Sequence, residues 1–234
     1  METTEPITRS ALEVRLNPLG WPVEADASEH YIQPYNAAAG EAQAVYEAFQ
    51  KASAEAANNP GLTDIGRRQA AHDWAEKHLP ALREKLARIR SSAAETIENA
   101  GKSMTAAFTA PAEEPQDIAM LQEVRSWLRT MPENQRTMKV VELARAGDRT
   151  ALRAVLTAPS YLTGVDHDLL TQVRDIVSEA DHPERFAKVQ AVKKAATYSE
   201  RALDGVIRFI EQEGTVLGKR PGSTDTAVRL PRSA

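Results

Sequence analysis

Two long amphipathic stretches, residues 63–108 and 166–213, constrain this chain of 234 residues more than any other feature. Apolar residues recur at steps of three and four from Leu79 to Phe108 and again from Phe186 to Ile210. This spacing is the period of helices that bury one face. Shorter helical segments lie between the two stretches. The pattern predicts an all-α fold: an elongated antiparallel long-helix pair, with a small helical bundle inserted between the two long helices.

Prolines and glycines interrupt both stretches. Pro80 removes a backbone donor inside the first stretch and should kink or divide it. Pro183 breaks the second stretch before a final helix over residues 183–213. If the halves beyond these prolines pair antiparallel, Gly101 and Gly205 face the opposite helix. Close approach of the two backbones would explain both glycines, and accidental placement on solvent-exposed faces explains them equally well.

Capping residues locate the other helices. Asn36, Thr63 and Asp166 suit helix N-caps, and Gly147 suits a C-terminal stop directly before another N-cap, Asp148. Together they predict shorter helices over residues 37–58, 116–131, 132–146 and 148–156. The first long stripe is expected to include Ile65. In the bundle, the apolar positions expected to form a small core are Ile118, Leu121, Val124, Leu128, Met138, Val141, Leu143, Leu152 and Val155.

The first 35 residues have no helical or strand periodicity, yet they are too apolar for a typical disordered segment. An extended arm that lays Trp21, Tyr31 and other apolar side chains on a surface explains both facts. That surface is either the chain's own helices or a neighbouring subunit. The predicted divisions are an extended N-terminal arm (1–35), a helical region with a long helix (36–108), a small helical bundle insert (109–165), a returning long helix (166–213) and a basic flexible C-terminal tail (214–234).

Charge and composition exclude several classes of protein. The formal net charge of −4 argues against a chain that binds nucleic acid over its whole surface. The tail is locally basic. It is either a solvated segment or a segment that makes weak contact with a polyanion. The chain contains no cysteine and no apolar run long enough to span a membrane, and its first residues do not resemble a signal peptide. A cytoplasmic protein fits these features. The basic residues of the tail are Lys219, Arg220, Arg229 and Arg232.

No reaction motif stands out. Phosphate-binding loops, serine-hydrolase elbows and zinc-protease helices are missing from the sequence, and His72 and His78 are six residues apart, on different sides of a helix. We therefore assign no catalytic, cofactor-binding or metal-binding residue. Trp127, Arg125 and Arg129 belong to the densest group of large and charged side chains and are candidate contact residues, whereas Trp21 in the arm is the better interface candidate. Trp127 is either an exposed anchor for a partner or part of a small helical core.

Residues 123–164, which contain EVRSWLRTMPENQR and ELARAGDRTALRAVLTAPSYLTG, resemble a pattern in uncharacterised helical proteins of tailed bacteriophages and prophages. The matching positions include Gly147-Asp148 and Ala158-Pro159, and the upstream residues 60–67 also fit, so the resemblance covers about residues 60–202. The resemblance implies a phage setting and carries no catalytic residues.

We therefore expect a non-enzymatic structural or assembly protein of a tailed bacteriophage: a capsid-associated accessory, an internal virion component or a scaffolding protein. Its partners would be phage structural proteins or further copies of itself as a homo-oligomer, with no membrane and no small-molecule substrate. It would work in the host cytoplasm during assembly or in the virion. The alternative is a cytoplasmic helical adaptor or regulator that binds a host or phage protein around Trp127. A helical enzyme with a carboxylate site is a third possibility.

Overall fold

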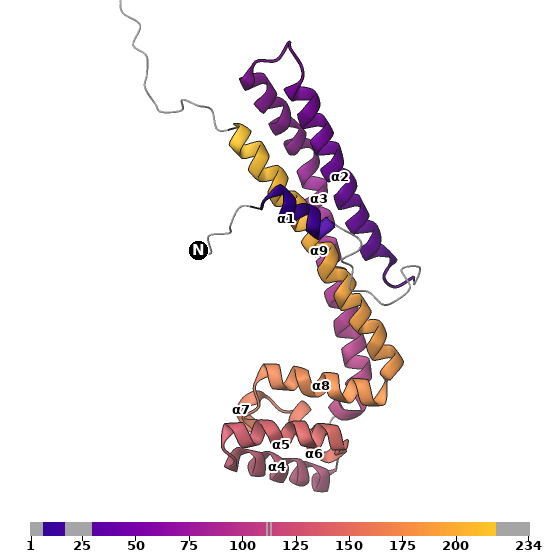
Figure 1. The fold of residues 1–234 in the computed structure, drawn as a ribbon. Coiled ribbons are helices and arrows are strands. Elements are labelled where there is room, and N and C mark those ends of the chain that lie inside the picture. The colour runs from indigo at the N-terminus through magenta and orange to yellow at the C-terminus, as the bar shows by residue number, and fades with distance from the viewer. Residues whose placement is uncertain (1–6, 17–29, 111, 113, 219–234) are drawn as a thin grey trace, which may run out of the picture. The chain divides into compact units, whose positions relative to one another are not determined.

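The computed structural model describes residues 7–16, 30–110, 112 and 114–218, and every regular element in these ranges is a helix. The predicted all-α class is confirmed. Contacts between residues divide the chain into unit 1, Met1–Ser92 with Lys194–Ala234, and unit 2, Ala93–Lys193 (Figure 1). The described helices are α1 (Arg9–Leu16), α2 (Gln33–Ala57), α3 (Asp64–Thr109), α4 (Pro115–Thr130), α5 (Glu133–Ala146), α6 (Arg149–Leu156), α7 (Ser160–Thr163), α8 (His167–Asp181) and α9 (Pro183–Gly218).

Within unit 1, α3 and α9 run in opposite directions. Arg83 of α3 pairs with Glu211 of α9 at 2.6 Å, and Arg90 pairs with Glu200 at 3.2 Å, so residue numbers rise on one helix as they fall on the other. Surface ion pairs of this kind contribute roughly 0–1 kcal/mol each. They therefore show the register of the two helices but add little to the stability of the pair. The stabilising contacts of unit 1 lie between its apolar faces.

Aromatic rings join three helices of unit 1. The ring of Phe49 in α2 lies 5.2 Å from Trp74 in α3, and Trp74 stacks on His78 at 4.1 Å. Tyr46 in α2 meets the edge of Phe209 in α9 at 5.4 Å. Aromatic pairs contribute about 0.5–1.5 kcal/mol beyond the area they bury. Trp74 and its neighbours thus hold α2, α3 and α9 together.

Residues 9–16 of the predicted extended N-terminal arm form the helix α1 instead, and residues 1–6 and 17–29 of the arm lie outside the described residues. Leu12 and Leu16, four residues apart, are buried on one face of this helix. The backbone N–H of Ile7 donates a hydrogen bond to Gln212 Oε1 at 3.1 Å. The exposed Val14 between Leu12 and Leu16 gives the segment an alternating pattern, which hides the helical spacing. This part of the N-terminus packs on its own unit.

Pro80 is predicted to kink or divide the first long helix; division is wrong, because α3 continues through Pro80 from Asp64 to Thr109. A proline inside a helix costs about 3 kcal/mol, and the burial of Leu79 and Leu82 on either side of the exposed Pro80 offsets that cost. The break at Pro183 is confirmed. His182 has a non-helical backbone, with φ −138° and ψ 56°, between α8 and α9.

Gly101 does not allow close approach of another helix, because a Cβ atom at this position would meet no neighbouring atom within 4 Å. Gly40 in α2 has the same open surroundings. We therefore expect Gly101→Ala and Gly40→Ala each to raise the free energy of unfolding by about 0.5–1 kcal/mol, since alanine loses less backbone entropy in a helix. Urea denaturation of both variants measures this. A loss of stability in either variant would mean that the position is more crowded than it is in the structure.

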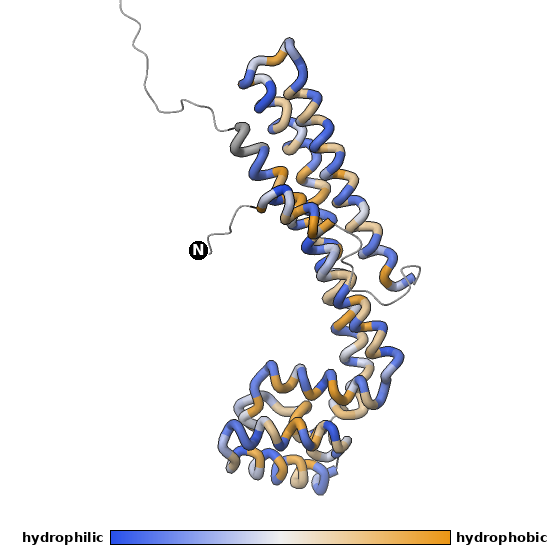
Figure 2. Tube along the Cα trace, viewed as in Figure 1, coloured by the Kyte–Doolittle hydropathy of each residue, from blue (hydrophilic) through white to orange (hydrophobic). Residues whose placement is uncertain are grey.

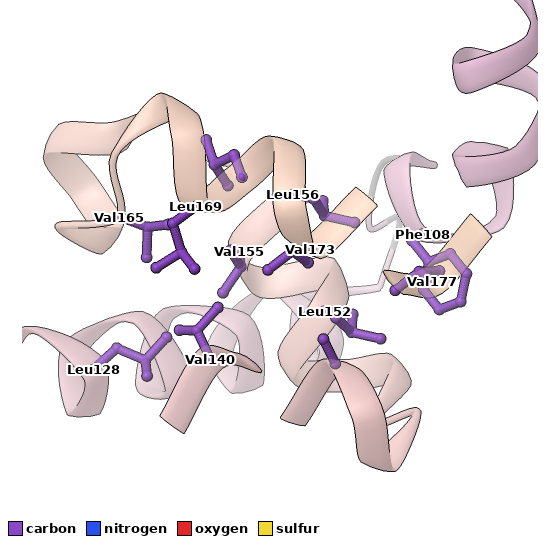
Figure 3. Packing of buried hydrophobic residues seen from close by; sticks show 12 residues of the cluster. Phe108, Leu128, Val140, Leu152, Val155, Leu156, Val165, Leu169, Val173 and Val177 are labelled. Carbon is purple, nitrogen blue, oxygen red and sulfur yellow. The ribbon is translucent and has the colours of Figure 1, made fainter. Parts of the chain in front are cut away.

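Unit 2 has its own apolar core, formed by α4, α5, α6, α8 and the last turn of α3 (Figure 3). The predicted caps of this unit are confirmed: Asp148 accepts from the N–H of Ala151 at 2.9 Å, Asp166 accepts from Leu169 at 2.7 Å, and Gly147 ends α5 with φ 68°. Hydrophobic and hydrophilic residues alternate along these helices (Figure 2). The buried members of the core are Phe108, Leu128, Val140, Ala144, Leu152, Val155, Leu156, Val165, Leu169, Leu170, Val173 and Val177.

Three residues expected in buried stripes are exposed instead. Met138 is 74% exposed because the core face of α5 is formed by Val140 and Ala144, and Met138, two residues before Val140, points to another side. Ile65 and Ile118 lie in the first turns of α3 and α4 and are 68% and 43% exposed. The alternation of apolar and polar residues locates the buried stripe, but it does not fix which flanking residues reach the core.

Candidate functional site

The helix α4 of unit 2 presents large apolar side chains to solvent. Met120 and Trp127 are seven residues apart, so they lie on the same side of the helix, two turns from each other. Trp127 is 42% exposed and Met120 is 51% exposed. Glu123, also exposed, lies between them at steps of three and four residues. We call Met120, Glu123 and Trp127 the α4 face.

The other side of α4 anchors the helix in the core. Leu128 is fully buried (Figure 3), and Leu121, seven residues before it, is 5% exposed. Because Trp127 directly precedes Leu128 in the helix, the burial of Leu128 fixes the direction in which Trp127 points. The α4 face is thus carried by a helix that is held along its length, which lowers the entropy cost of a contact made through it.

Arg125 helps to hold α4 in place. Its Nε donates to the carbonyl oxygen of Ala154 at 2.8 Å, and its Nη2 donates to Thr157 Oγ1 at 2.9 Å. Both acceptors belong to the C-terminal end of α6, where a cation is favoured by the unpaired carbonyl groups and the helix dipole. Arg125 is half-buried, and its donors are used inside unit 2. It therefore positions α4, and it is not a free contact residue.

Arg129 and the short helix α7 add exposed groups near α4. Arg129 is exposed and donates to Ser126 Oγ at 3.3 Å. The helix α7 packs against α4 and carries Tyr161, which is 79% exposed. No helix is predicted over residues 158–164, and Tyr161 is not among the predicted contact residues. Gly164, with φ 68°, closes α7, and this glycine is the signal that could have indicated a short helix.

Of the other predicted contact residues, the structure describes Tyr31. Tyr31 is half-buried in the turn before α2. Trp21 and the basic residues of the tail lie outside the described residues, so the predictions for them stay untested. These tail residues are Lys219, Arg220, Arg229 and Arg232.

The hydroxyl of Tyr46 connects two helices of unit 1. Burial and the negative charge of Glu13 raise the pKa of Tyr46, whose hydroxyl donates to Glu13 at 3.5 Å and links α2 to α1. His72 lies 3.4 Å from Glu76 on the rim of an open hollow of 500 Å³ beside Pro80.

Within residues 7–16, 30–110, 112 and 114–218, no group of three or more potential ligands surrounds a metal-sized site. No described helix is long and apolar enough to cross a bilayer.

No protein family model matches this chain, and neither a curated protein nor a solved structure matches it. The candidate site therefore stands on the geometry of unit 2. In that geometry the α4 face joins a large exposed aromatic side chain to a helix that is fixed by buried leucines and by Arg125.

Proposed function

We propose that this chain is a non-enzymatic helical protein that works through protein–protein contacts, with the α4 face as one contact surface. The observation that carries the proposal is Trp127, 42% exposed next to the fully buried Leu128. Tryptophan is enriched among the residues that dominate binding energy at protein interfaces. A partner that covers this exposed indole removes apolar surface from water, which stabilises the complex by about 25 cal/mol per Å² of apolar area.

We propose the assembly of a tailed bacteriophage as the setting. Support for it comes from the resemblance of residues 60–202 to helical phage proteins; the segment with most of the matching positions, residues 123–164, belongs to unit 2, which also carries the α4 face. The partner would be a phage structural protein or a second copy of this chain. A capsid-associated accessory, an internal virion component and a scaffolding protein all remain within this proposal.

A cytoplasmic adaptor or regulator is the second candidate, and the exposure of Trp127 favours it too. The two settings differ in where the protein is found. Mass spectrometry of purified virions and of assembly intermediates separates them, because a component of the particle or of its assembly must be present in one of these. Absence from both would contradict the phage assembly role and leave the adaptor.

The contact surface itself can be tested by photo-crosslinking. We expect a photoreactive phenylalanine analogue at position 127 to capture a partner in infected cells, and the same analogue at position 138 to capture far less. Both side chains are exposed in unit 2, but Met138 lies on α5 and not on the α4 face. With the captured partner, Trp127→Ala should then weaken binding about tenfold or more, the usual loss at such a residue. Equal capture at both positions would contradict the proposed surface.

A further inference from the structure

Unit 2 contains a groove that is lined by none of the residues of the α4 face. It lies between the second half of α3, the helix α8 and the first turns of α9, and its volume is 510 Å³. Pockets of about 300–1,000 Å³ are the size that holds small ligands or a few side chains of a peptide. We call it the α8 groove.

The floor of the α8 groove is apolar. Met104 of α3 and Val189 of α9 are buried beneath it, and Ile97 and Phe186 are half-buried along its length. The threonine hydroxyls that line it already donate to carbonyl groups of their own helices: Thr105 donates to Gly101 at 2.9 Å, and Thr171 donates to His167 at 3.0 Å. These walls therefore offer apolar contact area and few free donors.

Among the described residues, the rim of the groove carries three cations, Lys102, Arg174 and Lys193, but only two carboxylates, Glu98 and Asp175. Asp175 pairs with Lys193 at 3.7 Å, and Glu98 pairs with Lys102 at 2.6 Å, which lowers the pKa of Glu98. Arg174 of α8 also lines the groove and is half-buried.

Within the part of the chain that the structure describes, Arg174 makes no hydrogen bond or ion pair. A guanidinium presents up to five donors in a fork that matches a carboxylate.

We propose that the α8 groove binds a short acidic peptide segment of a partner protein, with an apolar side chain on the floor and a carboxylate paired to Arg174. The inference rests on the protein-binding function proposed above but concerns a different surface. Arg174 would form a bidentate pair with the incoming aspartate or glutamate, and such charge-assisted pairs are about twice as strong as neutral hydrogen bonds. The apolar side chain would cover Ile97 and Phe186.

The charges on the rim favour a single carboxylate over a polyanion. Glu98 and Asp175 stand on the same rim as Arg174, so a chain of phosphates would place negative charge against two carboxylates. Like charges in this arrangement reduce affinity. One carboxylate next to Arg174 meets the unpaired cation and avoids most of that repulsion.

Gly101 keeps the groove open. It lines the groove, and a Cβ atom there would meet no atom within 4 Å. A large side chain at this position therefore has room to enter the groove without displacing its walls. Gly101→Trp should fill the groove and block it, whereas Gly101→Ala should leave nearly all of its volume free.

A library of random short peptides, selected on the full chain, tests the proposal. We expect the enriched peptides to place an apolar residue close to an aspartate or glutamate. Fluorescent copies of them should bind Arg174→Gln about tenfold more weakly or worse. They should bind Gly101→Trp undetectably and Gly101→Ala as the unaltered chain. Arg145→Gln is the matched charge control, because Arg145 is an exposed arginine of unit 2 that makes no ion pair or hydrogen bond within the described residues and lies away from the groove.

The outcomes separate this inference from the proposed function. Circular dichroism and thermal unfolding of Gly101→Trp establish that the variant folds, and Arg174→Gln gives an answer that does not depend on it. Trp127→Ala should bind the selected peptides normally. Selection that yields no peptide, peptides without an acidic residue, equal binding to Arg174→Gln, or displacement by a single-stranded oligonucleotide would each overturn the α8 groove. None of these results would change the crosslinking expected at position 127.

Discussion

Replacement of Leu128 by alanine is expected to lower the free energy of unfolding by about 3–5 kcal/mol. Leu128 has no exposed surface and belongs to the unit 2 core (Figure 3), so the substitution removes buried methyl groups and leaves a cavity. Neighbouring helices relax only partly around such a cavity. Urea denaturation measures the loss. The fluorescence of Trp127, the next residue in α4, reports on the same part of the molecule.

Met138→Ala is the control for this expectation. Both positions belong to the apolar set that the sequence assigns to a core in the bundle, but Met138 is 74% exposed. Its truncation should change the free energy of unfolding by no more than about 0.5 kcal/mol, as for most surface substitutions. Similar losses at the two positions would show that α5 presents a different face to the core.

Gly164→Ala is expected to cost about 2–3 kcal/mol, for two reasons that add together. Gly164 has φ 68°, a backbone conformation that costs a residue with a Cβ atom about 1–2 kcal/mol. The new Cβ atom would also lie 1.5 Å from Arg136 Nη1, so the arginine must move. Arg136 donates to the carbonyl oxygens of Gly164 at 2.9 Å and Met131 at 3.3 Å, and both bonds would be disturbed. Chemical denaturation of the variant gives the value.

Gly147→Ala separates the two causes. Gly147 also has φ 68°, but a Cβ atom there would meet nothing within 4 Å, so we expect a cost of about 1 kcal/mol from the backbone alone. In an Arg136→Ala background, Gly164→Ala should fall to the cost measured at Gly147, because the clash is gone. Equal costs for the two glycine substitutions in the unaltered background would contradict a role for Arg136.

The sequence is sufficient to predict the long helices because their period is sampled many times. Each turn from Leu79 to Phe108 repeats the same spacing, and N-caps such as Asp148 and Asp166 bond to the backbone within three residues. The short helices α1 and α7 lack such signals, because the apolar residues Leu12, Val14 and Leu16 of α1 alternate in the sequence and α7 has only four residues. The choice between a kink and a division at Pro80 does not follow from the sequence, because the cost of a proline is local and the burial that offsets it comes from helices far away in the sequence.

The candidate site is less predictable from the sequence for the same physical reason. The sequence shows that Trp127 and Arg125 are close together, but their exposure depends on which side of α4 the rest of unit 2 covers. Arg125 finds its acceptors about thirty residues further on, at Ala154 and Thr157. The α8 groove needs three helices that no local pattern connects. Contacts between distant segments, absent from any one stretch of sequence, decide which side chains remain available.

The boundaries between the two units fall inside α3 and α9, after Ser92 and before Lys194, and this has a practical consequence for dissecting the protein. A fragment cut at these points would begin and end in the middle of a helix. Each cut helix end would leave up to about four N–H or C=O groups without partners in the chain. Fragments of unit 2 therefore need added capping residues or extra helical turns at both ends, and binding experiments should begin with the intact chain.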